Sequence, residues 1–519
     1  MPPEVAARDS RRLWLGYGAM CVGMFMAILD IQVVASSLTS IAAALELSDS
    51  QLGWIQTSYL MAEVIAIPLT GILTRALSLR WMFAVATLAF TLASVGCALS
   101  GSIGTLVAFR VAQGFFGGML IPAVFSAVFV MMPERHRLRA TTIAGVFALL
   151  APTLGPVVGG YLTETHSWQW IFLINVAPGL LVTGLVAAYV RVGVPDRSAL
   201  RCLDLFGLAS FATSLALLQL LLNEGPTRHW QGGFVALTIT ACIVSGALGI
   251  GRCLTATHPF IDLKRFGNVA FAAGCIFSFV LGLGLFGSIF IMSLFLGLVR
   301  EHPPLIIGEV LMVTGIAQLL TAPVSAWAET RVACRLLTML GFGLFSAGLL
   351  ANGFVTPQSD FAALFWPQVL RGSALMLCLL PTTRLALEIW PAAQVPEASA
   401  VFNLVRNLGG AIGIALINTM VQERASGHVA HLVASLQAGD PVTARFVGLP
   451  VALFHNRPMG PVDDMTRIMI TPLIKRAALT QVLNEAWIAL AILFAMSLLA
   501  LPLMGRRRPR PTYARAPLS

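Results

Sequence analysis

The stretch TLVAFRVAQGFFGGMLIPAVFSAVFVM, residues 105–131, decides the fold class. It is almost continuously apolar, and its only charged residue is Arg110. A helix that crosses a bilayer needs about 20 predominantly apolar residues, so this stretch predicts a transmembrane helix. Comparable runs recur along the chain, and together they predict fourteen spans. These begin near Leu13, Leu52, Trp81, Thr105, Ala140, Trp170, Leu205, Phe234, Ala270, Pro304, Leu336, Phe361, Ala398 and Leu483.

The composition agrees with an all-α polytopic membrane protein. Hydrophobic residues make up 57% of the 519 residues, charged residues only 11%, and the mean hydropathy is +0.84. A soluble chain carries about a quarter charged residues. So little charge cannot cover a water-exposed surface, but it suits a protein whose outer belt faces lipid.

The net charge of +10 is distributed in short basic clusters between the apolar runs. This is the positive-inside pattern of membrane proteins, so we expect the lipid bilayer, and no nucleic acid, as the partner of these residues. Alternating the loops places the basic clusters on one side, with both termini in the cytoplasm. Arg8, Arg11 and Arg12 precede the first run without a small-residue cleavage site, which indicates a retained helix rather than a removed signal peptide.

These assignments divide the chain into seven parts. The predicted parts are a cytoplasmic N-terminus (1–12), a first six-helix bundle (13–191), a linker (192–203), two extra helices (204–251), a second linker (252–269), a second six-helix bundle (270–505) and a basic tail (506–519). The polar segment 422–480 lies within the second bundle, and we expect it outside the cell, partly helical, as a cap or docking surface. A weak repeat supports the two halves, because residues 139–160 resemble residues 397–418 with Gly155 in register with Gly413. Repeats of this kind relate the two halves of major facilitator proteins.

Ionisable side chains inside membrane helices cost roughly 2.5–3.5 kcal/mol on insertion scales, so each needs a reason. Five stand out here, namely Asp30, Glu63, Arg110, Arg371 and Arg406. They either pair with one another and lock the helices, or line a water-filled path for protons and substrate. We expect the acids Asp30 and Glu63 to carry protons, because a low dielectric favours the neutral form of a carboxyl group. Arginine stays charged, so Arg110, with Gln113 beside it, can only tune a nearby acid.

One predicted helix is unusually rich in glycine and proline. Small residues four apart let helices approach closely, and proline kinks a helix. This is either ordinary membrane packing or a functional helix. The residues concerned are Pro152, Gly155, Pro156, Gly159 and Gly160.

Several of these motifs resemble those of the major facilitator superfamily, specifically its fourteen-spanner drug:proton antiporter family of the EmrB/QacA type. The motifs are LDIQVVASSL (29–38), LVAFRVAQGFFGG (106–118), GPVVGG (155–160), WQWIFLINVAPG (168–179), HPFIDLKRFGN (258–268) and ASAVFNLVRNLGGAIG (398–413). The resemblance implies a proton-transfer role for Arg110 and an antiporter motif in the GPVVGG helix. In the second half, the polar candidates are Arg371, Asn403, Arg406 and Asn407.

The resemblance further implies the Gram-negative branch of the family. Such a protein lies in the bacterial inner membrane, exports hydrophobic toxic compounds by proton exchange, and works with a periplasmic adaptor and an outer-membrane channel. It needs no cofactor or metal beyond the proton motive force, and no nucleophile–base or metal constellation indicates an enzyme. An exporter of one metabolite, lipid or siderophore, or an uptake symporter, stays open on the same fold.

The loop GILTRALSLRW, residues 71–81, departs from the superfamily's commonest motif. That motif has an aspartate and a second glycine where this chain has Arg75 and Ser78. The tenth span has Val313 near the place of a proline usual in the family. We therefore expect a different pair of residues to close the cytoplasmic side.

Overall fold

The computed structural model describes residues 3–46, 49–192, 195–196, 204–256, 263–392, 394–454 and 464–503, which form helices and short connections without a strand. The first half contains α1 (Pro3–Ser36), α2 (Leu38–Leu45), α3 (Asp49–Ala98), α4 (Ile103–Met131), α5 (Glu134–Thr165), α6 (Trp170–Leu173) and α7 (Val176–Tyr189). Two further helices follow, α9 (Leu205–Thr227) and α10 (Gly233–Thr255). The second half contains η1 (Leu263–Gly267), α11 (Val269–Leu294), η2 (Phe295–Val299), α12 (Pro304–Arg331), α13 (Cys334–Asn352), α14 (Phe361–Leu387), α15 (Val395–Gln437), α16 (Pro441–Val447), η3 (Val451–Leu453), α17 (Asp464–Ser497) and η4 (Leu498–Leu503).

Within the described residues, twelve helices are long and apolar enough to cross a membrane, or thirteen if the two bent parts of α5 count as one span. The sequence predicts fourteen. Helix α3 covers two of the predicted runs, and its backbone leaves the helical conformation at Ser78, with φ of 72°. A positive φ favours glycine, which is the residue usual at this place in the motif that the loop departs from.

The two halves pack against each other through the two repeat-bearing helices. Helix α5 of the first half contacts α12 of the second, and α15 of the second half contacts α3 of the first. Gly308 of α12 makes one close approach possible, since a Cβ there would lie 2.2 Å from a methyl group of Val157. Gly71 of α3 makes another close approach possible, since a Cβ there would lie 2.9 Å from Cα of Glu397. The two repeat helices thus occupy corresponding places across the interface.

The extra helices α9 and α10 form a hairpin beside this interface. They pack on each other, and α9 also contacts α3 and α15. Leu215 of α9 is buried in a small cluster with Val64, Ile67 and Leu404, and Asn223 donates to the Thr57 hydroxyl at 2.7 Å. The hairpin therefore contacts both halves on the outside of the bundle.

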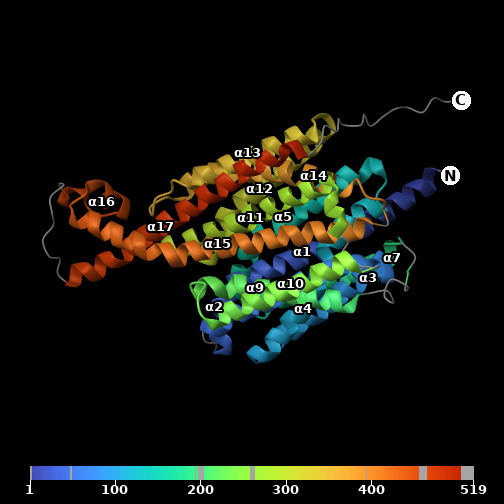
Figure 1. Cartoon of the computed structure of the whole chain (residues 1–519), viewed down its shortest axis with the longest axis horizontal. Coiled ribbons are helices and arrows are strands. Elements are labelled where there is room, and N and C mark those ends of the chain that lie inside the picture. Colours follow the sequence, from blue (N-terminus) through green and yellow to red (C-terminus); the bar gives the residue numbers. More distant parts are fainter. Residues whose placement is uncertain are drawn as a thin grey trace.

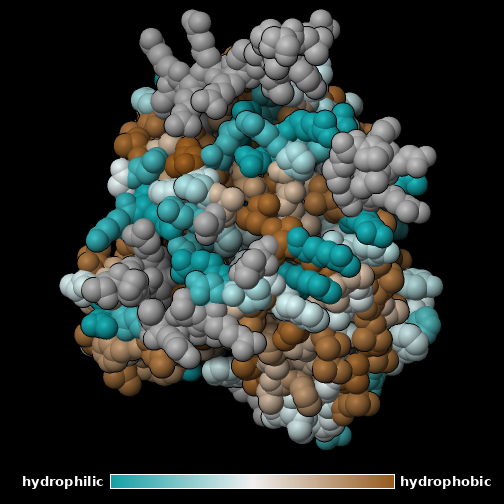
Figure 2. Space-filling model, turned by 90° about the vertical axis from the view of Figure 1, so that its right-hand side faces the viewer, coloured by the Kyte–Doolittle hydropathy of each residue, from teal (hydrophilic) through white to brown (hydrophobic). Residues whose placement is uncertain are grey.

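Helix α1 begins and α17 ends toward one end of the molecule, whereas α16 lies at the opposite end (Figure 1). Seen from the end where α1 begins, hydrophilic residues gather across the middle and hydrophobic residues flank them (Figure 2). At the other end, most of the predicted polar segment 422–480 is helical, because α15 runs on to Gln437 and α17 begins at Asp464. A separate apolar cluster holds this end together, and it contains Leu432, Leu436, Ala444, Val447, Phe454, Ala477 and Ala478.

Candidate functional site

The first half contains a buried polar network centred on Asp30 of α1. Arg110 of α4 donates from Nη1 to Asp30 Oδ2 at 2.5 Å, and neither side chain is exposed. Gln113, one turn further along α4, donates to Asp30 Oδ1 at 2.9 Å. Asn175, directly before α7, donates to the same oxygen at 2.8 Å. The carboxylate thus has one cationic and two neutral donors from two segments, α4 and the residue before α7, as a buried charge requires.

Helix α3 completes the surroundings of Arg110. The Nε donates to the Ile55 carbonyl at 3.1 Å, and the guanidinium carbon lies 4.3 Å from the centre of the Tyr59 ring. Gly114 permits this approach, because a Cβ there would lie 2.2 Å from the Tyr59 carbonyl oxygen. The adjacent pair Arg110 and Gln113 that the sequence singles out therefore contacts Asp30, while their role in proton coupling stays a prediction.

Glu63 lies elsewhere, at the interface between the halves. Its side chain is buried, and Asn407 of α15 donates to its Oε1 at 3.3 Å. Gly118 of α4 packs against the Glu63 backbone. Its hydrogen-bonding partner is thus an amide from the second half and not the Asp30 network.

The glycine- and proline-rich part of α5 packs closely on α1. A Cβ at Gly155 would lie 2.2 Å from Cβ of Gln32. The Ser37 hydroxyl, between α1 and α2, donates to the Gly159 carbonyl at 3.4 Å and lies 2.7 Å from the Thr163 hydroxyl. The helix bends by 46° after Pro152, and the neighbouring Pro156, Gly159 and Gly160 are buried. The predicted close approach and kink are both present in the structure.

The polar candidates of the second half do not form one site. Arg371 of α14 is buried and donates from Nη2 to Thr314 at 3.3 Å and to Gln368. Arg406 of α15 donates to Ser278 at 3.3 Å and faces Phe125 of the first half at 5.5 Å.

Asn403 donates only within its own helix, to the Ser399 carbonyl at 2.8 Å. This amide group therefore bonds one turn back along α15. Asn407 instead reaches Glu63, as described above, so the two asparagines of this helix have different surroundings.

At the end where α1 begins, one salt bridge connects the two halves, and a second one to the same carboxylate lies within the second half. Arg75, in the loop that departs from the superfamily motif, contacts Glu397 of α15 at 2.7 Å. Arg265 of η1 contacts the other Glu397 oxygen at 2.6 Å. Nearby, Ser399 donates to the Pro122 carbonyl of α4 at 2.9 Å. We call Arg75, Arg265 and Glu397 the clasp; it is a different pairing of the kind that the sequence led us to expect.

Second-half residues also join the apolar core of the first half at this end. Phe271, Leu387, Val401 and Phe402 belong to the same buried cluster as the first-half helices. Polar and apolar contacts therefore hold the halves together at the end that the loop charges assign to the cytoplasm.

Sequence reasoning missed Asn175 and Glu397. Asn175 is a neutral amide, so a search for ionisable residues in apolar runs passes over it, although it lies inside the quoted motif WQWIFLINVAPG. Glu397 stands at the start of a predicted helix, where an acid is favoured by the helix dipole in any case. Its contact with Arg75 joins distant parts of the chain and leaves no local pattern.

Comparison with known proteins identifies the relatives of this chain. The family described as the Major Facilitator Superfamily matches residues 20–414. The colistin resistance protein EmrB of Acinetobacter baumannii is 37% identical over 428 residues, which cover 82% of this chain and 84% of that protein. The multidrug export protein EmrB of Escherichia coli K12 is 30% identical over 426 residues, covering 82% and 83%. Among solved structures, the proton:xylose symporter XylE shares the fold, with a TM-score of 0.61 over 95% of both chains at 15% identity.

Proposed function

Because the chain belongs to the Major Facilitator Superfamily and is closely related to the EmrB proteins, we propose that it exports hydrophobic toxic compounds in exchange for protons. It is a multi-pass membrane transporter and not an enzyme. The names of the two relatives, a colistin resistance protein and a multidrug export protein, support export as the direction.

The observation that carries the proton-coupled part of this proposal is the Asp30–Arg110 pair with fully buried side chains. Breaking one partner of a buried ion pair leaves an uncompensated charge, so such pairs are sensitive to the protonation of the acid. Protonation of Asp30 removes the negative member, and Arg110 and the two amide donors must then find other partners. A proton thereby changes the packing of α1, α4 and the start of α7 at once.

Glu63 is the second proposed proton site. Its hydrogen bond to Asn407 crosses between the halves, so its charge state acts directly on the interface that must rearrange during alternating access. Antiport on this scheme requires that substrate binds while the cytoplasmic end is open and leaves while that end is closed. The clasp and the apolar cluster around it support assignment of the present conformation to the state in which the cytoplasmic end is closed.

We also propose the finer topology. Dividing α3 at Ser78 and counting the bent α5 as one span gives the fourteen spans that the apolar runs predict. An even number agrees with the start of α1 and the end of α17 lying at one end of the molecule (Figure 1). The positive-inside bias then supports assignment of this end to the cytoplasm, and the likeness to the EmrB proteins supports a bacterial inner membrane as the location.

The test is proton release on substrate addition in proteoliposomes that contain the purified protein. Asp30→Asn keeps the shape of the side chain but cannot ionise, so we expect it to abolish substrate-induced proton release and pH-driven transport. Asp204→Asn is the matched control, because Asp204 also pairs with an arginine, Arg252, at 3.0 Å, but lies at the start of α9 away from the network. Undiminished pH-driven transport by Asp30→Asn would exclude Asp30 as the proton carrier.

The outer segment is the proposed contact for a periplasmic adaptor, which would link the pump to an outer-membrane channel. It presents apolar side chains to the surroundings, with Val442, Ile468 and Met469 at 74%, 68% and 69% exposure. We expect replacement of these three by serine to lower adaptor co-purification without changing proton release. If the serine variant and the unmodified protein recover the same amount of adaptor, the contact lies elsewhere.

A further inference from the structure

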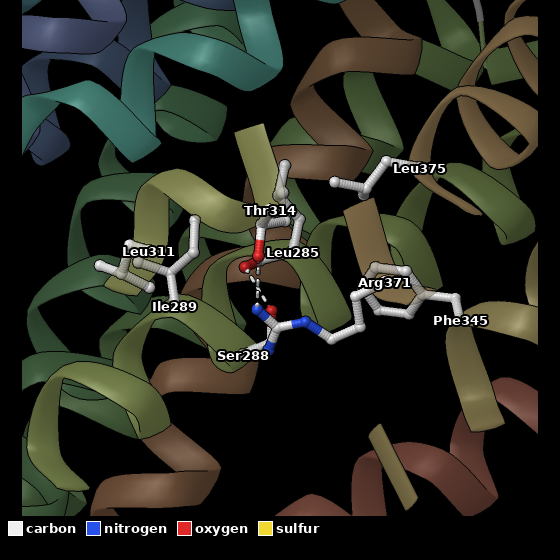
Figure 3. Close-up of a pocket in the computed structure, with 8 residues that line it drawn as sticks. All are labelled: Leu285, Ser288, Ile289, Leu311, Thr314, Phe345, Arg371 and Leu375. Carbon is white, nitrogen blue, oxygen red and sulfur yellow. Dashed lines mark hydrogen bonds between the residues drawn. The ribbon is translucent and has the colours of Figure 1, made fainter. Parts of the chain in front are cut away.

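Glu329, near the end of α12, is a buried acid outside the sites described above. Its side chain is 2% exposed, and neither carboxylate oxygen has a hydrogen-bonding partner among the described residues. Asp30, by contrast, has three donors. Arg371 of the neighbouring α14 is also buried, and it donates to Thr314 beside a small cavity (Figure 3). An arginine stays charged in such a place, whereas the carboxyl group of Glu329 can bind a proton.

The charged groups that the structure describes around Glu329 do not neutralise a negative charge on it. Arg384 of α14 is the nearest cation, with its Nη1 3.9 Å from Oε1 of Glu329, which is too far for a hydrogen bond. The Nε of Arg384 instead donates to Glu388 at 2.7 Å. The other titratable neighbours are the Glu388 carboxylate itself and the thiol of Cys334, at the start of α13. Neither of them supplies a positive charge.

The position of Glu329 in its helix also disfavours a negative charge. Helix α12 ends at Arg331, so Glu329 lies in the last turn. The free carbonyl groups of a last turn give that end of the helix a partial negative charge. A buried carboxylate without donors is costly, and a low dielectric favours the neutral form of a carboxyl group. All of these conditions favour a protonated Glu329 in the present conformation.

A helix of the first half covers the side of α12 on which Glu329 lies. Gln318 lies on the same side three turns earlier and donates to the Val146 carbonyl of α5 at 3.4 Å. Further from the clasp, Gly308 packs against Val157. The two helices are therefore antiparallel, and this register brings Glu329 level with the first turn of α5. On the proposed alternating-access cycle, opening of this end moves the start of α5 away from α12 and lets water reach the carboxyl group.

We propose that Glu329 is a proton-binding site of the second half, which holds a proton while the cytoplasmic end is closed and releases it to the cytoplasm when that end opens. In this step the carboxyl O–H bond breaks and water takes up the proton. Water then solvates the carboxylate, and Arg384, which is 39% exposed, places a positive charge beside it. The inference rests on the proposed proton-driven export, and it adds a third acid to Asp30 and Glu63.

The test is infrared difference spectroscopy of the purified protein in lipid nanodiscs, without substrate and without a proton gradient. The spectrum of Glu329→Gln is subtracted from that of the unmodified protein at neutral pH, so that the difference reports the protonation of this one side chain. We expect the carbonyl band of a protonated carboxyl group, shifted in D2O, and no carboxylate band. Glu309→Gln is the matched control, because Glu309 is exposed near the start of the same helix, and its difference spectrum should show a carboxylate.

A second background holds the same end open. A Cβ at Gly71 would lie 2.9 Å from Cα of Glu397, so the large side chain of Gly71→Trp prevents the close approach of α3 and α15. In this background, subtraction of the spectrum that also carries Glu329→Gln should show a carboxylate band in place of the carbonyl band. An unchanged circular dichroism spectrum and a single size-exclusion peak show that the variant is folded, and the comparison in the unmodified background does not depend on it.

Two results would overturn the inference. A carboxylate band for Glu329 in the unmodified protein would mean that the acid is charged while the end is closed. A carbonyl band in both backgrounds would make Glu329 a permanently neutral packing residue. Because the spectra need neither substrate nor gradient, a failure of Asp30→Asn to stop transport would produce neither of these results, and the two proposals can fail separately.

Discussion

The clasp makes a quantitative prediction about how the end where α1 begins is closed. Glu397 accepts from Arg75 and Arg265 through different oxygens. The Arg75 side chain is 47% exposed, so that contact contributes about 0.5 kcal/mol, as solvent-screened pairs do. The Arg265 side chain is 5% exposed, and a charged hydrogen bond in such a place contributes about 1.5 kcal/mol. Arg265 and Glu397 both belong to the second half, so only the Arg75 contact crosses between the halves. Removing the charge of Glu397 should therefore destabilise the closed end by about 0.5 kcal/mol, a factor of about two in population.

The assay is a distance distribution from double electron–electron resonance, with spin labels at positions 135 and 335 in a cysteine-free background. Arg135 and Arg335 are exposed near the starts of α5 and α13, one in each half. We expect Glu397→Gln and Arg75→Gln each to increase the widely separated population about twofold relative to the closed one, because both remove the same contact between the halves.

Glu388 provides the matched control. It also pairs with an arginine at the same end, but Arg384 belongs to its own helix at 2.7 Å. Glu388→Gln removes an ion pair without releasing a contact between halves, so its distance distribution should match that of the parent protein. If Glu397→Gln gives the same distribution as Glu388→Gln, the clasp does not hold the halves together and the reasoning is wrong.

Two further predictions concern other parts of the chain. Gly155→Ala forces Cβ against Gln32, so we expect it to lower unfolding stability by about 1–3 kcal/mol, seen as a lower melting temperature in detergent; Gly184→Ala, where nothing lies within 4 Å of the new Cβ, should leave it unchanged. Hydrogen bonds from the Thr443 hydroxyl and the Val442 N–H lower the pKa of Asp440 from 3.8, so its carboxylate stabilises the start of α16 at neutral pH and that stabilisation is lost as the pH falls through the lowered value. Hydrogen exchange of α16, corrected for intrinsic rates, should therefore accelerate below about pH 4 in the parent protein but show no such pH dependence in Asp440→Ala.

The membrane spans and part of the site could be predicted because each follows from the free-energy cost of placing the residues of one segment in the membrane. An apolar run of sufficient length has few alternatives to a membrane helix. An ionisable side chain inside such a run, as at Asp30 or Arg110, is costly and therefore indicates a structural or functional role without knowledge of its partner. The break at Ser78 also lies between two predicted runs. These are properties of one segment at a time, and one sequence is enough to show them.

Contacts between segments could not be predicted in the same way. Nothing near Glu63 indicates that its partner is Asn407 on a helix of the other half, and nothing near Arg75 indicates Glu397. Such pairs depend on the three-dimensional packing of α3 on α15. The sequence does show that the usual loop aspartate is absent, which predicts a different closure, but not which residue would provide it.

The repeat explains why the two halves can carry different buried polar groups on a similar framework. Helices that correspond across the halves place their side chains at matching positions, so a change of residue type alters the chemistry without altering the frame. In the first half an acid and a base neutralise each other, at Asp30 and Arg110. In the second half Arg371 has no such acid among the described residues. Any coupling between the halves passes through their contacts, which include α5 with α12 and also the α3–α15 interface, where Glu63 meets Asn407 and the clasp lies.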